Sequence, residues 1–133
     1  MRQSARRFVV PQNVNTALER VLGEPVDTVV VIEYSLYARA HLNMSATTRP
    51  NRILLKISGA HFIANHEMLL HEYFHVVHQW RPGHLTRWRY LLESARCGYW
   101  NNRYEREARE FAAAAADRYR LYLQATRARD ALQ

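Results

Sequence analysis

The chain has 133 residues, of which 48% are apolar and 23% are charged, as in an ordinary globular domain. Its length supports one domain that buries most of its apolar surface, and the lone cysteine, Cys97, excludes an internal disulfide framework. The net charge of +7 is compatible with a polyanionic partner. The arginines are scattered and not interleaved with stacking aromatic residues, which argues against nucleic-acid binding as the main function.

No segment has the pattern of a signal peptide or a membrane span. The basic residues at the start of the chain are followed only by Phe8, Val9 and Val10 before Pro11. We therefore expect no membrane association and a location in the reducing cytoplasm. Export by a secretion machine that reads no signal peptide would leave the same sequence pattern.

The glycines and prolines divide the first half of the chain into one helix and three strands. Apolar residues at helical spacing predict a helix over 13–22. β-branched residues predict a buried strand over 26–34. Alternation within 37–48 and the segment RILLKIS at 52–58 predict two further strands, and hence a small three-stranded sheet.

The second half of the chain has helical periodicity throughout. We expect a helix from about 62 to 81, ended by a Pro-Gly pair, and another over about 84–96. A long alanine-rich helix is predicted from about 103 to 125. No internal repeat or linker separates these elements, so residues 1–133 are predicted to form one α+β domain.

The segment LLHEYFHVVHQW, residues 69–80, places polar side chains in an otherwise apolar predicted helix. At about 100° per residue, they fall on one stripe about 120° wide: His71, Glu72, His75 and His78. A helix this apolar is buried on nearly every side, and unpaired buried polar groups cost on the order of 1–3 kcal/mol each. Four of them on one stripe indicate a common partner.

The spacing of His71 and His75 indicates a zinc site. His71 and His75 lie one turn apart on one face, so both rings can reach the same ion. Glu72 lies to the side, where it can reach a water on the metal and take its proton during attack on a carbonyl. His78 lies about 10 Å along the axis from His71, too far for the same ion. We expect it to form a buried hydrogen bond or to support a ligand.

A catalytic zinc ion needs a third protein ligand, and residues 101–116 offer several glutamates. Glu105 shares a helix face with Ala108 and Ala112, whose small side chains would let this helix approach the histidine helix closely. Spacing alone leaves Glu107 open as an alternative. An exposed helix with glutamate–arginine pairs would need no metal at all.

The HExxH motif at 71–75, with Glu105 downstream, resembles the gluzincin group of zinc metallopeptidases. Residues 50–115 are similar to small bacterial zincin domains of contractile injection systems and phage-type elements. They also resemble the peptidases that cleave phage and mobile-element repressors, whose third ligand opens an E-x-E-A-x-x-F-A pattern. That pattern stands here at 105–112, so the resemblance implies Glu105 as the third metal ligand.

The resemblance implies a zincin-like α+β domain with a buried active-site helix and a C-terminal helical part that carries the third ligand. A strand lining the cleft would pair with an extended peptide; the candidates are 52–58 and 37–48. Two departures leave the subfamily open. His78 stands where injection-system domains usually carry glutamine, and Asn102-Arg103 replaces an asparagine–proline pair.

The predicted activity is zinc-dependent hydrolysis of peptide bonds in a protein or peptide, with Glu72 as base and a narrow substrate or an effector role. Tyr99, and after it His84, are the expected oxyanion-stabilising residues. The alternative is a non-catalytic zinc-binding interaction or assembly module, although such a site needs no base. A basic nucleic-acid-associated regulator or nuclease is less favoured, because the aspartate-rich sites typical of magnesium nucleases are missing from the sequence.

Overall fold

The sheet of the computed structural model, which describes residues 4–36 and 45–132, has four strands in the order β1-β2-β4-β3. β2 and β4 run parallel, and the other two neighbouring pairs are antiparallel. The strands are β1 (Arg6–Phe8), β2 (Val30–Glu33), β3 (Ala46–Arg49) and β4 (Arg52–Leu55). The fold is therefore α+β, as predicted, with β3 at one edge of a mixed sheet.

The expected three-stranded sheet is wrong by one strand, because β1 was not predicted. β1 has three residues, two of them exposed arginines, so no hydrophobic alternation marks it. It forms through long-range contacts: it pairs with β2, and Arg6 forms an ion pair with Glu33 at 2.5 Å. The Phe8 ring occupies the space where a side chain at residue 59 would stand, which only glycine leaves free.

The strand expected within 37–48 is observed only at its end. β3 covers Ala46–Arg49, while 37–44 lie outside the described residues. The other two predicted strands are shorter than expected, since β2 begins at Val30 and β4 ends at Leu55.

The helices follow the predicted order with different boundaries. They are α1 (Gln12–Leu22), α3 (Gly59–Ala64), α4 (His66–Phe74), the π-helix η1 (His75–Trp80), α5 (Arg87–Asn101) and α6 (Arg103–Ala131). The single helix expected over 62–81 is interrupted at Asn65, whose side chain accepts a hydrogen bond from the Met68 N–H and so caps α4. α5 continues past its predicted end across a kink at Gly98, where φ is 76°.

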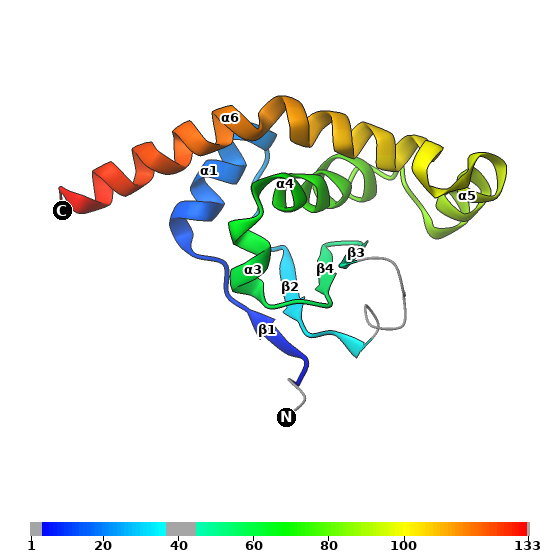
Figure 1. The fold of residues 1–133 in the computed structure, drawn as a ribbon, viewed down its shortest axis with the longest axis horizontal. Helices are drawn as coiled ribbons and strands as arrows, with labels where there is room; N and C mark the ends of the chain where they lie inside the picture. The colour runs from blue at the N-terminus through cyan, green and yellow to red at the C-terminus, as the bar shows by residue number, and fades with distance from the viewer. Residues whose placement is uncertain (1–3, 37–44, 133) are drawn as a thin grey trace.

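The α4 helix lies between the sheet and the long α6 helix (Figure 1). α1 packs against α6 on the same side, and buried apolar residues of these helices and of the strands form one core cluster. Ala108 and Ala112 of α6 are buried, as their small side chains predicted. This close packing brings the start of α6 against the end of α4.

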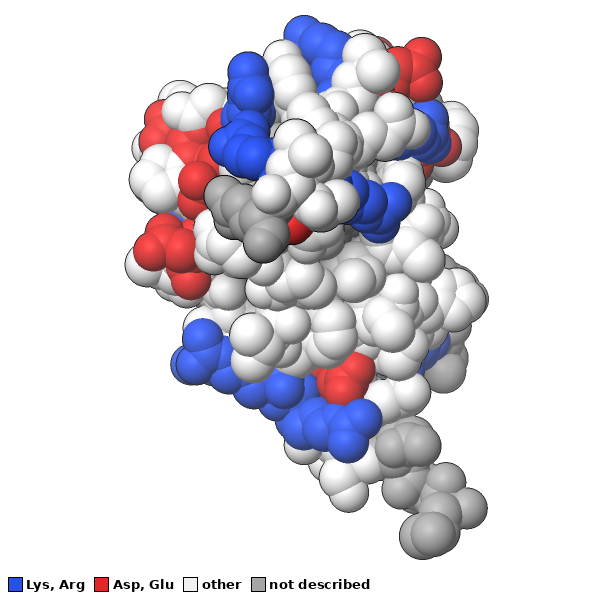
Figure 2. Space-filling model, turned by 90° about the vertical axis from the view of Figure 1, so that its left-hand side faces the viewer, with Lys and Arg blue, Asp and Glu red and all other residues white. Residues whose placement is uncertain are grey.

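The described helices include none that combines the length and hydrophobicity needed to cross a bilayer. Figure 2 shows the face at the C-terminal end of α6, where basic side chains form separate groups among acidic and uncharged residues.

Candidate metal centre

Three side chains, one each from α4, the adjoining π-helix and α6, lie close together. His71 lies in the last turn of α4, His75 begins the π-helix, and Glu105 lies in the first turn of α6. The ligand atoms that they offer all lie within 4.8 Å of one another. His75 and Glu105 are each 3% exposed, so a charged group at this point is largely shielded from water.

The atoms of the triad lie close enough together to bind one metal ion. Ligand atoms bound at about 2.05 Å to a tetrahedral zinc ion lie about 3.3 Å from one another. The His71 Nε2–His75 Nε2 distance is 3.2 Å. Glu105 places Oε1 3.1 Å from His75 Nε2 and Oε2 2.9 Å from His71 Nε2. The two short contacts of Glu105 are made by different oxygens, and the three ligand atoms lie within 4.8 Å of one another, so the triad could hold a metal ion.

The ring of His75 is oriented by Gln79 of the π-helix. His75 Nδ1 lies 2.6 Å from Gln79 Oε1, while the Gln79 amide nitrogen donates to the Tyr104 carbonyl at 3.0 Å. Because an amide oxygen only accepts, Nδ1 carries the proton, and in the neutral ring Nε2 keeps its lone pair. Gln79 thus holds His75 in the tautomer that a metal ligand needs.

The carboxylate of Glu105 is held by two tyrosines as well as by the histidines. Tyr90 donates to Oε1 and Tyr99 to Oε2, each at 3.2 Å. Burial opposes ionisation of Glu105, but hydrogen bonds from His71 and His75 outweigh it and hold its pKa well below the usual range. Burial and the nearby charge of Glu105 raise the pKa of both tyrosines, so their hydroxyls remain protonated donors.

The metal-free triad retains a proton. Burial lowers the pKa of His75, but the hydrogen bond and charge of Glu105 outweigh burial and raise it to about 9. At neutral pH the proton on His75 therefore occupies the position that a metal ion would take. A metal ion must displace this proton in order to bind.

Glu72 is a buried carboxylate beside the triad. Within residues 4–36 and 45–132 it has no hydrogen-bond or ion-pair partner. Burial raises its pKa, the charges of His75 and His71 lower it, and that of Glu105 raises it; the net direction is upward. Its carboxylate oxygens are not among the fully buried polar atoms that lack a partner in the described residues, so they remain open to water or a ligand.

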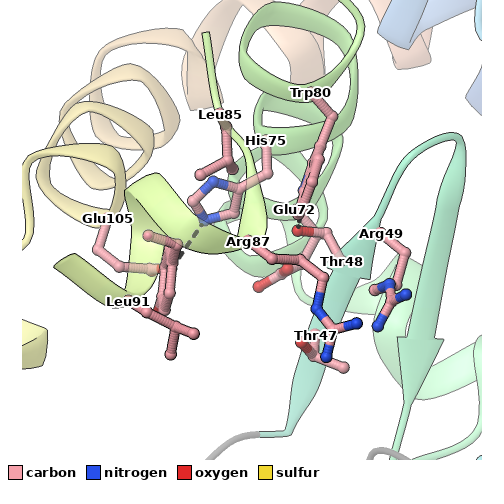
Figure 3. A pocket seen from close by; sticks show the side chains of 11 residues that line it. Thr47, Thr48, Arg49, Glu72, His75, Trp80, Leu85, Arg87, Leu91 and Glu105 are labelled. Carbon is pink, nitrogen blue, oxygen red and sulfur yellow. Dashed lines mark hydrogen bonds and ion pairs between the residues drawn. The ribbon is translucent and has the colours of Figure 1, made fainter. Parts of the chain in front are cut away.

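Two cavities meet at Glu72. The first, of about 300 Å³, also contains His75 and Glu105, and the second, of about 510 Å³, contains His71 and Tyr99. Residues 47–49 of β3 line the first cavity together with Glu72 and His75 (Figure 3). Glu72 thus lines both cavities, and each cavity also has at least one residue of the triad in its lining.

The edge strand β3 forms one wall of the first cavity. Of the two segments expected to line a cleft, 52–58 supplies β4, which lies inside the sheet between β2 and β3. Residues 46–49 supply β3, which pairs with no other described strand on its outer side. The segment 37–48 therefore contributes the wall through its last residues.

The remaining candidates lie away from the triad. Glu107 is exposed, and its carboxylate accepts a hydrogen bond from Gln79 at 3.3 Å. His78 hydrogen-bonds the Leu22 carbonyl at 2.9 Å, the kind of role expected for it. His84 is exposed, its ring lines neither cavity, and its backbone carbonyl accepts from Tyr104 at 3.3 Å.

The sequence pattern did not single out Gln79 or Tyr90 for this site. Gln79 could have been found, because it follows His75 at the same four-residue spacing that relates the two histidines. Tyr90 carries no such signal. It reaches Glu105 because Asn102, which caps α6, lets the chain turn back after α5.

The chain matched no family model, no curated protein and no solved structure.

Proposed function

We propose that the protein is a zinc-dependent endopeptidase of the gluzincin type. In this proposal His71, His75 and Glu105 are the zinc ligands, and Glu72 is the general base. One observation carries it: Glu72 is buried, lacks a partner among the described residues, and faces both cavities beside the triad. A purely structural metal site would need no carboxylate in that position.

Zinc bound to the triad would polarise the scissile carbonyl and make an attacking water more acidic. Glu72 would take the proton from that water and return it to the leaving amine. Tyr90 and Tyr99 are protonated donors that line the first and second cavities respectively. Either hydroxyl could turn from Glu105 to the developing oxyanion, so Tyr90 joins Tyr99 as a candidate for this role.

The substrate would be a protein or peptide that binds in an extended form. The outer edge of β3 is unpaired among the described strands and lies next to the first cavity. A peptide adding to this edge would gain main-chain hydrogen bonds and pass Glu72. We propose a narrow protein substrate, as expected for an effector or a regulatory peptidase.

Zinc content tests the metal part of this proposal. Native mass spectrometry of the protein prepared with zinc should show about one zinc ion per chain. Removal of zinc should lower the melting temperature, because the ion binds the folded state. A protein that binds no divalent ion under these conditions would contradict the proposal.

Glu72→Gln tests the catalytic part. The amide keeps the size of the side chain but cannot accept the proton, so cleavage of a library of unfolded peptides should fall about 10²–10⁴-fold. Zinc content and melting temperature should be unchanged. Glu110→Gln is the matched control, since Glu110 is an exposed residue of α6 and its substitution removes the same charge.

A chelator should abolish the same cleavage, and added zinc should restore it. If wild type and Glu72→Gln are equally inactive on broad libraries but bind the same partner equally well, the endopeptidase proposal fails. The non-catalytic assembly module would then account for the zinc site.

A further inference from the structure

The α5 helix, Arg87–Asn101, exposes apolar side chains to an unusual degree. It buries none of its fifteen residues, and Trp88, Leu91 and Leu92 are 77%, 56% and 68% exposed. Helices in proteins are normally stabilised by packing of an apolar face. Figure 1 places α5 at the end of the molecule opposite the C-terminus, beside the start of α6.

The exposed apolar residues share one face of the helix. At about 100° per residue, Leu91, Ala95, Trp88 and Leu92 span about 100° of its circumference. The opposite side contacts the body of the protein, where Tyr90 and Ser94 hydrogen-bond to Glu105 and Asn102. We call the outward face, formed by Trp88, Leu91, Leu92 and Ala95, the α5 stripe.

Arginines flank the α5 stripe on both sides. On the same helical projection, Arg87 borders it at one margin and Arg96 at the other. Both are exposed, and neither forms an ion pair with an acidic side chain among the described residues. An apolar surface between two unpaired cationic margins complements a segment that carries apolar residues with acidic neighbours.

The stripe is continuous with the candidate active site. Leu91 belongs to the stripe and also lines the first cavity, together with Arg87 and the catalytic candidate Glu72. A bilayer or a second copy covering the stripe would therefore also cover this mouth of the cavity. A substrate chain leaving the cavity past Leu91, in contrast, would lie along α5 without closing the site.

We propose that the α5 stripe is a docking surface for an acidic, apolar segment of the protein substrate. This inference rests on the proposed endopeptidase function. Trp88 and Leu92 supply the apolar contact, and Arg87 and Arg96 select acidic residues on either side of it. The stripe thus explains how a small domain with an open site acts on a narrow set of proteins.

Binding is tested with two fluorescent amphipathic peptides of about 18 residues, one with leucines flanked by glutamates and a twin with lysines in place of the glutamates. Fluorescence anisotropy is measured with the full chain carrying Glu72→Gln, which prevents cleavage. We expect binding of the glutamate peptide and none of its twin. Trp88→Ser with Leu92→Ser should weaken binding at least about tenfold, and Arg96→Glu should weaken it most at low salt.

The control variants are Leu121→Ser and Arg118→Glu on α6. Leu121 is 64% exposed and Arg118 is exposed, so these changes match the test variants in chemistry but lie far along α6 from α5. They should leave binding unchanged. Equal binding of both peptides, binding of neither, or full retention by the Trp88/Leu92 variant would overturn the proposal.

Two other occupants are outcomes of the same test. Wild type could bind phosphatidylglycerol vesicles in preference to the glutamate peptide and lose this binding in the Trp88/Leu92 variant. That result would overturn the proposal in favour of a lipid surface. Self-association in sedimentation that is lost in the same variant would overturn it in favour of a second copy.

Cleavage separates this inference from the proposed function. On the glutamate peptide extended by a cleavable unfolded segment, the Trp88/Leu92 variant should raise KM and leave kcat unchanged. Cleavage with unchanged KM would refute the docking surface while the endopeptidase stands. Selective binding without any cleavage by wild type would refute the endopeptidase and leave the stripe as a binding site for an acidic partner.

Discussion

Replacing Gln79 with leucine should weaken metal binding, although Gln79 is not itself one of the proposed metal ligands. The Gln79 side chain is 2% exposed; it accepts from His75 Nδ1 at 2.6 Å and donates to the Tyr104 carbonyl at 3.0 Å. Leucine has a similar volume but offers neither group. His75 then loses the hydrogen bond that fixes its tautomer and ring orientation.

The expected magnitudes follow from these contacts. Loss of an outer hydrogen-bond partner typically reduces metal affinity about 10–100-fold, which is about 1.4–2.7 kcal/mol. The substitution also leaves the Nδ1–H of His75 without a partner, whereas the Tyr104 carbonyl lies in the first turn of α6 and still accepts from the amide four residues on. At about 1–3 kcal/mol for a buried group left unpaired, the metal-free protein should lose about 1–3 kcal/mol of unfolding free energy, less any gain from burying leucine.

Zinc affinity is measured by competition with a chromophoric chelator, and stability by urea unfolding of the metal-free protein. His78→Leu is the matched control, because His78 lies on the same π-helix and donates to the Leu22 carbonyl. It should cost about 1–3 kcal/mol with unchanged zinc affinity. Gln79→Glu, which can still accept from His75, should bind zinc better than Gln79→Leu. If zinc affinity falls in His78→Leu and not in Gln79→Leu, Gln79 does not orient the site.

Three further predictions follow from the contacts of the site and the sheet. Glu105→Ala should abolish stoichiometric zinc binding in native mass spectrometry, whereas Glu107→Ala should retain it; the opposite result would place the ligand two residues away. In urea unfolding, the metal-free protein should lose a few kcal/mol of unfolding free energy as pH rises from about 6.5 to about 9. The reason is that the pKa of His75 is raised to about 9 in the folded state, so folding favours the protonated ring. With zinc bound, the urea midpoint should instead rise with pH, since zinc competes with that proton. Gly59→Ala should lower the unfolding free energy by about 1–3 kcal/mol, because a Cβ there meets the Phe8 ring, and Phe8→Ala should suppress part of that cost in a double-mutant cycle.

Local helical geometry explains what could be predicted. Residues four apart on a helix lie on one face whatever the helix packs against, so the convergence of His71 and His75 follows from their spacing. The same geometry predicted that His78 would not join them. The apolar surroundings of the motif predicted burial, and the small residues Ala108 and Ala112 predicted close approach of a second helix.

Contacts between distant segments could not be read from that pattern. Spacing alone left Glu107 open beside Glu105, and the packing of α6 against α4 turns Glu105 toward the histidines. The residues of β1 have no strand pattern of their own. The strand forms because it pairs with β2 and because Phe8 packs against Gly59. Likewise, β3 rather than β4 lies next to the cavity because long-range strand pairing puts β3 at the edge of the sheet.

Side-chain spacing along a helix is set by the backbone, so the residue pattern alone was enough to place two imidazoles and a carboxylate on one buried helical segment. The remaining groups of the site come from long-range packing. The carboxylate of Glu105 and the hydroxyls of Tyr90 and Tyr99 reach the site through packing of α5 and α6. Such contacts depend on where helices cross, and a crossing is settled by the whole core rather than by any local pattern.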